Sequence, residues 1–258
     1  NYKVLPSPLP VGSPENGQLH DMKQNPEQHS ESACRLSPSL LDWFQQGPGA
    51  MVSEAECKVL AEQVTDLFGY RLLQLGCLGP GQDYLRNCPV REQVRVDVCG
   101  CGDVVQLCAR PEQLPVMPDS IDAVILPHTL DFAHDPHQVL REVERVLIPE
   151  GRLLITGFNP LSLWGLWRLV RRVLRRKHDQ VPWCGHFLSY PRLQDWLTLM
   201  GFDIERADVR VFRPPMGRAS ALTRLGFMER WGQRWWPMLA GVYVVRAVKR
   251  VSTLRPVG

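Results

Sequence analysis

The sequence predicts an α/β protein in which a mostly parallel sheet carries helices on both faces. Three consecutive segments support this: an apolar run at 121–128, an amphipathic stretch at 135–147 and a second apolar run at 152–158. The apolar runs are short and bounded by turn residues, as buried strands are, while Asp135 and Pro136 begin a helix with apolar residues at helical spacing. A strand, a helix and a strand in this order form a parallel βαβ unit.

The composition is that of one globular domain. Of 258 residues, 44% are hydrophobic and 22% are charged, which suffices for one full core. Residues 1–38 are polar and lack periodicity, so we expect a disordered or loose arm. A plausible start at Met22 suggests that residues 1–21 are either an added leader or a wrongly extended start. No apolar run approaches the roughly 18 residues that span a bilayer. Scattered cysteines indicate reduced thiols and a cytoplasmic protein.

Further elements are expected on both sides of this unit. A helix is predicted at 53–68, with Ser53 as its N-cap and Glu56 completing a capping box. Only residues 99–102 separate the second predicted strand from the third, which is too short for a crossover helix. The other predicted elements are helices at 40–44 and 191–200 and strands at 70–75, 94–98, 103–108, 202–212 and 241–251.

A basic amphipathic helix is predicted at 161–177, with apolar residues on one face and arginines on the other. It could form a lid over a substrate cleft, lie on a membrane surface, or present an anion-binding face. The pattern favours a simpler interpretation, a helix packed on the protein with its arginines in water.

Four motifs follow one another between Leu114 and Pro160. They are L-P-V at 114–116, D-S-I-D-A-V at 119–124, D-P-H-Q-V-L-R-E-V-E-R-V-L at 135–147 and P-E-G at 149–151. In this order they closely resemble the second half of a class I S-adenosylmethionine-dependent methyltransferase with a type 11-like domain. The resemblance implies the Rossmann-like fold of that class, with a seven-stranded, mostly parallel sheet. It places the domain at 39–258, with a basic lid-like segment at 161–190 and a substrate-side insert at 213–240.

The same resemblance implies an S-adenosylmethionine site around the glycine loop after the first strand. Glycines let a backbone approach a nucleotide closely, and Asp97 lies about 20 residues after Gly76, where nucleotide-binding folds place a ribose-binding acid. A plain tight turn and a solvent-facing Asp97 are the alternatives. The implied cofactor-binding residues are Gln74, Gly76, Cys77, Gly79, Gly81, Asp97, Glu112, Leu114 and His128.

Three positions depart from the family pattern. Gln74 replaces an acid, and it cannot offer a carboxylate to the ammonium group of the cofactor. Leu78 replaces the central glycine. Arg110 stands where related proteins have an acid that contacts adenine, and arginine has only donors, so Glu112 is the expected substitute.

His128 and Asp131 follow the fourth strand, at the edge of the sheet where ligands bind. They are candidate catalytic residues, with His128 as a general base, although His128 could instead line the pocket through its backbone. Methyl transfer from a sulfonium needs mainly in-line positioning, so no base is obligatory.

Cys88, Cys99, Cys101 and Cys108 lack the paired spacing of structural zinc sites, so no metal is predicted. The sequence therefore predicts a methyltransferase that acts on a small molecule, one that is lipid-like or anionic if the basic helix contacts it. Peripheral membrane contact through 161–177 is an alternative to the packed helix, and a nucleic-acid partner is not expected. The main rival is a non-catalytic, methyltransferase-like binding or scaffold protein, motivated by the three departures. A nicotinamide-dependent oxidoreductase is disfavoured by the later motifs.

Overall fold

The computed structural model describes residues 39–76, 84–98, 105–174, 182–213 and 236–250. The predicted arm at 1–38, the glycine loop beyond Gly76 and most of the predicted insert at 213–240 lie outside these ranges. In the described part, seven strands form one sheet in the order β3-β2-β1-β4-β5-β7-β6. The strands are β1 (Arg71–Leu75), β2 (Glu92–Asp97), β3 (Leu107–Cys108), β4 (Ile121–Pro127), β5 (Leu147–Phe158), β6 (Phe202–Arg210) and β7 (Val242–Lys249).

Only β7 runs against its neighbours. It pairs antiparallel with β5 and β6, whereas the other strand pairs are parallel. The predicted α/β class and the seven-stranded, mostly parallel sheet are confirmed. The strands predicted on either side of the short 99–102 link both belong to this sheet, as β2 and β3.

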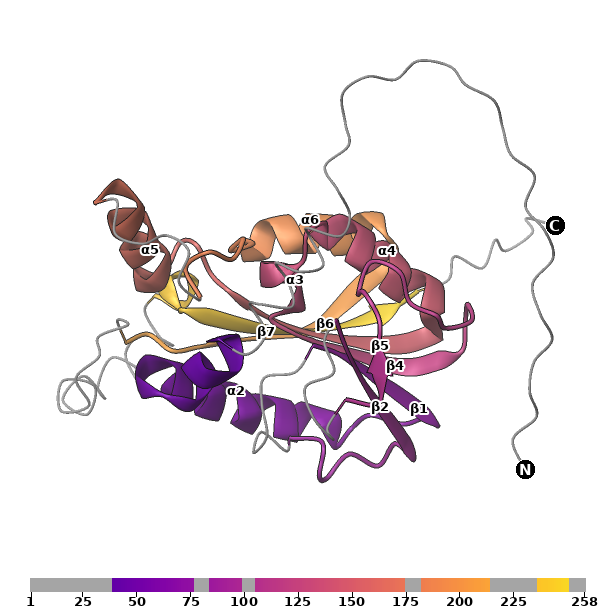
Figure 1. Ribbon diagram of the computed structural model, residues 1–258. Coiled ribbons are helices and arrows are strands. Elements are labelled where there is room, and N and C mark those ends of the chain that lie inside the picture. The colour runs from indigo at the N-terminus through magenta and orange to yellow at the C-terminus, as the bar shows by residue number, and fades with distance from the viewer. Residues whose placement is uncertain (1–38, 77–83, 99–104, 175–181, 214–235, 251–258) are drawn as a thin grey trace, which may run out of the picture.

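Helices cover both faces of the sheet (Figure 1). The long helix α2 (Gly47–Val64) lies on one face, and α3 (Thr129–Phe132), α4 (Pro136–Val146) and α6 (Tyr190–Leu199) lie on the other. A fifth helix, α5 (Leu163–Val173), projects at one end of the sheet, away from α4. Within the described residues, no helix is both long and apolar enough to cross a membrane.

Successive side chains along the strands pack alternately into two separate hydrophobic cores, one on each face of the sheet. Leu73 on β1 packs into the cluster that contains the apolar residues of α4 and α6, whereas its neighbour Leu72 packs into the cluster beneath α2. This follows from the period of two along a strand, which sends successive side chains to opposite faces. Both faces of β1 are therefore buried, as expected for a central parallel strand.

The N-terminus of α4 forms as predicted. The carboxylate of Asp135 accepts hydrogen bonds from the backbone N–H groups of His137 and Gln138, and Pro136 follows in the first turn. The four apolar residues of the helix that face the sheet are fully buried: Val139, Leu140, Val143 and Val146. The strand after the helix starts at Leu147, earlier than the predicted 152, and Glu150 takes a positive φ of 62° within it.

The prediction for α2 was wrong at both ends. The helix begins at Gly47 with a proline in its first turn, so Ser53 lies inside it and caps nothing. Pro48 was the signal, because proline is compatible with the first helical turn and its missing N–H costs nothing there. Glu56, assigned to a capping box, is instead a buried carboxylate in the interior of the helix.

Candidate cofactor and substrate site

The carboxyl ends of β1, β2 and β4 bring the predicted cofactor residues to one edge of the sheet. Leu75 at the end of β1 is in register with Val96 on β2, and the Gly76 N–H donates to the Val96 carbonyl at 2.8 Å. Asp97 ends β2 beside this contact. Ligands of open parallel sheets bind at this edge, and the cofactor site predicted from the sequence lies there.

Gly76 occupies a position that requires glycine. Its φ is +91°, in a region that other residues avoid, and an added Cβ would lie 3.2 Å from the Thr129 hydroxyl oxygen. That hydroxyl donates to the Leu75 carbonyl, so it holds the end of β1 against the first residue of α3. The remaining predicted loop residues, Cys77, Gly79 and Gly81, lie outside the described residues.

Asp97 and Gln74 are both nearly buried at this edge. One carboxylate oxygen of Asp97 accepts from the backbone N–H of Val98 at 2.7 Å, which fixes the side chain at the strand end. The Gln74 amide donates to the Gly76 carbonyl at 2.9 Å. Gln74 therefore braces the loop from within, and its amide occupies the place where the family pattern has a carboxylate.

The Leu114 turn is held by an ion pair on α4. The Leu114 N–H donates to Glu142, and Arg145 donates to the carbonyls of Leu114 and Val116. Glu142 and Arg145 also pair with each other at 2.8 Å. The Arg145 hydrogen bond lowers the pKa of Glu142, and Glu142 raises the pKa of Arg145, so both stay charged. Glu142 and Arg145 are three residues apart, and this spacing on a helix indicates an ion pair. The spacing does not indicate that the pair also binds the backbone of the Leu114 turn.

Arg110 and Glu112 lie in the turn before Leu114. Arg110 is exposed and forms a short antiparallel bridge with Gln113. The Glu112 carboxylate accepts from the His134 N–H at 3.2 Å, which ties this turn to the segment before α4. Whether Glu112 replaces the missing acid at the adenine remains a prediction.

Behind this edge lies a buried group of three titratable side chains. The His128 imidazole contacts Glu56 of α2 through Nε2 at 2.7 Å and Asp131 of α3 through Nδ1 at 2.8 Å. All three side chains are almost completely inaccessible to water. Asp131 also accepts from the Phe158 N–H at 2.9 Å, so the group joins α2, the β4 end and the β5 end.

Comparisons with known proteins agree with this geometry. The methyltransferase domain family matches residues 83–155. A methyltransferase from Thermotoga maritima that depends on S-adenosylmethionine has the same fold, with a TM-score of 0.58 and 19% identity over 86% of this chain and 100% of that one. The chain therefore has the class I methyltransferase fold.

Two protein relatives match parts of the chain. The uncharacterized protein YafS of Escherichia coli is 38% identical over 165 residues, which are 64% of this chain and 66% of YafS. Malonyl-(acyl-carrier protein) O-methyltransferase of a Methylovorus species is 30% identical over 106 residues, 41% of this chain and 34% of that enzyme. The matched segments thus span less than two thirds of either relative.

The structure shows that His128 cannot act as the general base that the sequence suggested. Burial lowers its pKa, but the charge of Glu56 and the hydrogen bonds that the imidazole donates to Asp131 and Glu56 outweigh this and raise the pKa to about 9. The imidazole is therefore a cation at neutral pH, with both N–H groups donated to carboxylates and no lone pair to accept a proton. Burial raises the pKa of Asp131, which is equally inaccessible to a substrate.

The group has a structural role instead. His128 takes a positive φ of 53°, a conformation that costs energy in a residue other than glycine or Asn, and its two carboxylate contacts hold it there. It fixes α2 against the edge of the sheet beside Gly76. Sequence reasoning missed Glu56 because 72 positions separate it from His128, and no local pattern links the two.

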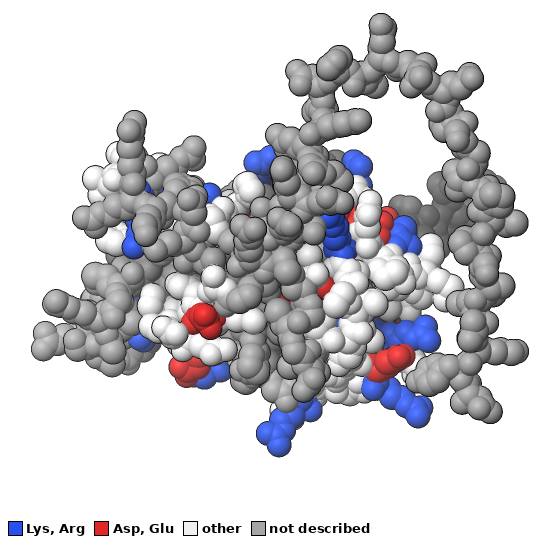
Figure 2. Space-filling model, viewed as in Figure 1, with Lys and Arg blue, Asp and Glu red and all other residues white. Residues whose placement is uncertain are grey.

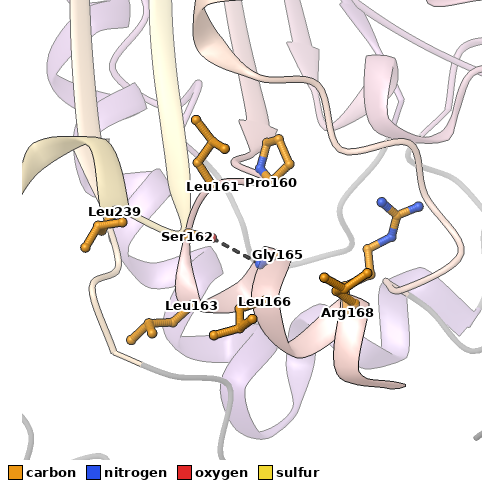
Figure 3. Close-up of a pocket in the computed structure, with 9 residues that line it drawn as sticks. Pro160, Leu161, Ser162, Leu163, Gly165, Leu166, Arg168 and Leu239 are labelled. Carbon is orange, nitrogen blue, oxygen red and sulfur yellow. Dashed lines mark hydrogen bonds between the residues drawn. The ribbon is translucent and has the colours of Figure 1, made fainter. Parts of the chain in front are cut away.

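A pocket of about 490 Å³ lies on the same edge, beyond the end of β5. Its walls come from the loop after β5, from α5 and from the short helix η2 (Pro237–Leu239), and they are mostly apolar (Figure 3). Leu161, Leu163, Leu166 and Leu239 line it together with Arg168.

Within the described residues, no three His, Cys, Asp or Glu side chains gather as metal ligands.

Proposed function

We propose that this methyltransferase binds S-adenosylmethionine and transfers its methyl group to a small molecule with an apolar part. One observation carries the proposal: the glycine-requiring turn at Gly76 lies beside the Asp97 carboxylate, on the edge that also bears the apolar pocket. A carboxylate there can accept hydrogen bonds from both ribose hydroxyls of a nucleoside.

The residues fit the cofactor in part. Gly76 leaves room for close approach, Asp97 offers two acceptors, and the buried Leu114 presents an apolar side chain held by the α4 ion pair. Gln74 meets the ammonium end with an amide, so a charge interaction is lost there. The bound cofactor supplies an electrophilic methyl group on a sulfonium. The chain then has to orient the acceptor and exclude water, which needs no titrating residue.

The apolar pocket supports an acceptor with an acyl or other apolar portion, because its walls offer little besides Arg168 for polar recognition. Malonyl-(acyl-carrier protein), the acceptor named for one partial relative, belongs in the first acceptor screen.

Calorimetric titration with S-adenosylmethionine and S-adenosylhomocysteine, with NADH as control, tests cofactor binding. We expect binding of both adenosyl compounds and none of NADH. Asp97→Ala should weaken binding by more than ~1 kcal/mol, the scale of hydrogen bonds to a charged group. Asp203→Ala, the same change at an exposed site on β6, should leave affinity unchanged. Equal affinity in the Asp97 variant would remove Asp97 from the site.

The departures at Gln74 and Arg110 favour one alternative, a binding or scaffold protein that no longer catalyses. Arg110→Asp separates the two, since it should tighten cofactor binding if Arg110 occupies the adenine position. An acceptor screen without turnover, on protein that binds neither adenosyl compound, would favour the scaffold.

A further inference from the structure

The helix α5 turns its apolar face away from the protein. Leu166, Leu169 and Val173 are 55%, 56% and 73% exposed, whereas Trp164 on the opposite side is fully buried. An amphipathic surface helix ordinarily buries its apolar stripe. In α5 the orientation is reversed, and leucine and valine side chains project where a soluble surface has polar ones.

Specific contacts hold α5 in this orientation. The Trp164 indole donates to the Arg213 carbonyl at 2.8 Å, and its ring stacks on Trp183 at a centroid distance of 6.0 Å. Arg168 donates to the Trp183 carbonyl at 2.9 Å and lies over the Phe187 ring. Arg171 lies over the Trp183 ring. Cation–π contacts and a buried tryptophan thus fix the arginine side against the body of the protein.

The exposed apolar surface continues beyond α5. Leu161 in the preceding loop and Met238 and Leu239 in η2 are also exposed, and the pocket lies between these two segments (Figure 3). Exposed Trp167 and Trp236 border the surface. We call this surface the apolar end; it comprises Leu161, Leu166, Leu169, Val173, Met238 and Leu239. A contiguous apolar surface of this kind marks an interaction site.

The charge around the apolar end has one sign. The described segments that build it, 159–174, 182–189 and 236–241, contain no aspartate or glutamate, although the chain has 27 acidic residues. They do contain Arg168 and Arg171, which are both partly exposed. In Figure 2, white and blue side chains are visible at the end of the molecule where Figure 1 places α5. The partner of this surface should therefore be both apolar and anionic.

We propose that the apolar end docks on the surface of an anionic lipid bilayer. The helix α5 carries leucine, valine and tryptophan on its outer side, arginines on its other side and no acidic residue, which is the composition of helices that lie in a membrane interface. A second copy of the chain fits less well, since a two-fold contact would set the same arginines against one another. Docking in this way also places the mouth of the pocket against the lipid.

Co-sedimentation of the full chain with vesicles tests this proposal without any cofactor, so its outcome is independent of the proposed activity. Vesicles of equal parts phosphatidylglycerol and phosphatidylcholine should bind the protein at low salt, and added salt should weaken the binding. Vesicles of phosphatidylcholine alone should bind it less. The double variant Leu169→Glu with Val173→Glu should lower partitioning by about tenfold or more, because two apolar groups are withdrawn from the interface.

Leu199→Glu is the matched control, since Leu199 is exposed on α6, away from the apolar end. This variant should bind anionic vesicles as well as the parent protein does. Because the substituted side chains are exposed, the double variant and Leu199→Glu should both unfold at the same temperature as the parent protein. No binding to anionic vesicles at low salt would overturn the proposal, as would equal binding by the double variant and the parent. A double variant that loses stability would show that the chain itself covers this face. Conversion of a dimer to a monomer without vesicle binding would assign the face to a second copy.

Discussion

The helices α4 and α5 have the same length and the same kind of amphipathic pattern, yet they bury opposite sides. Each has 11 residues with apolar and charged side chains on opposite faces. In α4 the apolar stripe is fully buried against the sheet, whereas in α5 it faces outward and a single tryptophan is buried instead. Amphipathicity therefore indicates that a helix lies at a boundary, but not which of its faces meets the protein.

The physical cause lies in what each helix meets. Beneath α4 is an apolar sheet face that offers no hydrogen bonds. Beneath α5 are the aromatic rings of Trp183 and Phe187 and the Trp183 backbone carbonyl, which bind guanidinium groups well. The simpler interpretation from sequence, a helix with its arginines in water, was thus wrong for Arg168 and Arg171.

The sharpest way to break the comparison is to remove the residue that anchors α5. Trp164 is fully buried, and the absence of a side chain at Gly241 makes room for it, since a Cβ there would lie 2.6 Å from the indole. We expect Trp164→Ala to lower the free energy of unfolding by about 3–5 kcal/mol. Urea denaturation measures this. Trp167→Ala, at a partly exposed position of the same helix, should cost far less, and equal losses would show that Trp164 is no anchor.

A matched pair of leucines tests the comparison directly. Leu140→Ala on α4 should cost about 2–5 kcal/mol, because it leaves a cavity in the core. Leu169→Ala on α5 should change the stability by no more than ~0.5 kcal/mol, since that side chain is exposed. The shift in urea midpoint at constant slope measures both. A large loss at Leu169 would contradict the outward orientation of α5.

The helix α2 adds a third case, in which the buried face carries a charge. His128 has a folded pKa of about 9, above its ordinary 6.5, so folding favours its protonated form. The contribution of His128 to the free energy of unfolding is complete below pH 6.5. As the pH rises to 9, the protein loses on the order of 2–3 kcal/mol of this stability. Urea denaturation at both pH values should show this loss in the parent protein. In His128→Gln the same pH change should have little effect, and an unchanged pH dependence there would assign the effect elsewhere.

The smallest expected effect concerns the helix starts, where α4 and α5 should agree. Asp135 caps α4, and the Ser162 hydroxyl accepts from the N–H groups of Trp164 and Gly165 at the start of α5. We expect Asp135→Ala and Ser162→Ala each to cost about 1 kcal/mol, since capping depends on local geometry and not on which face is buried. Thermal unfolding of both variants measures this. Loss at one site only would mean that the two helices differ at their starts as well as in orientation.

Local signals predicted much of the fold and part of the site. The Asp135 cap, the apolar spacing of α4 and the two strands around it are features of neighbouring residues, and the structure shows all of them, although β5 begins five residues earlier than expected. The same reasoning brought Gly76 and Asp97 to one edge, because parallel strands end together. It failed for α2, where a plausible capping box at Ser53 competed with the proline that begins the helix.

The amino-acid sequence was sufficient for the class of fold and for the parallel βαβ unit, since both follow from short-range periodicity. Three features came only from the folded chain: the contact of Glu56 with His128, the hold of Glu142 and Arg145 on the Leu114 turn, and the outward apolar face of α5. Each depends on which surfaces meet after distant segments have packed. That choice is made by burial and by hydrogen bonds between residues far apart, so no local pattern in the sequence records it.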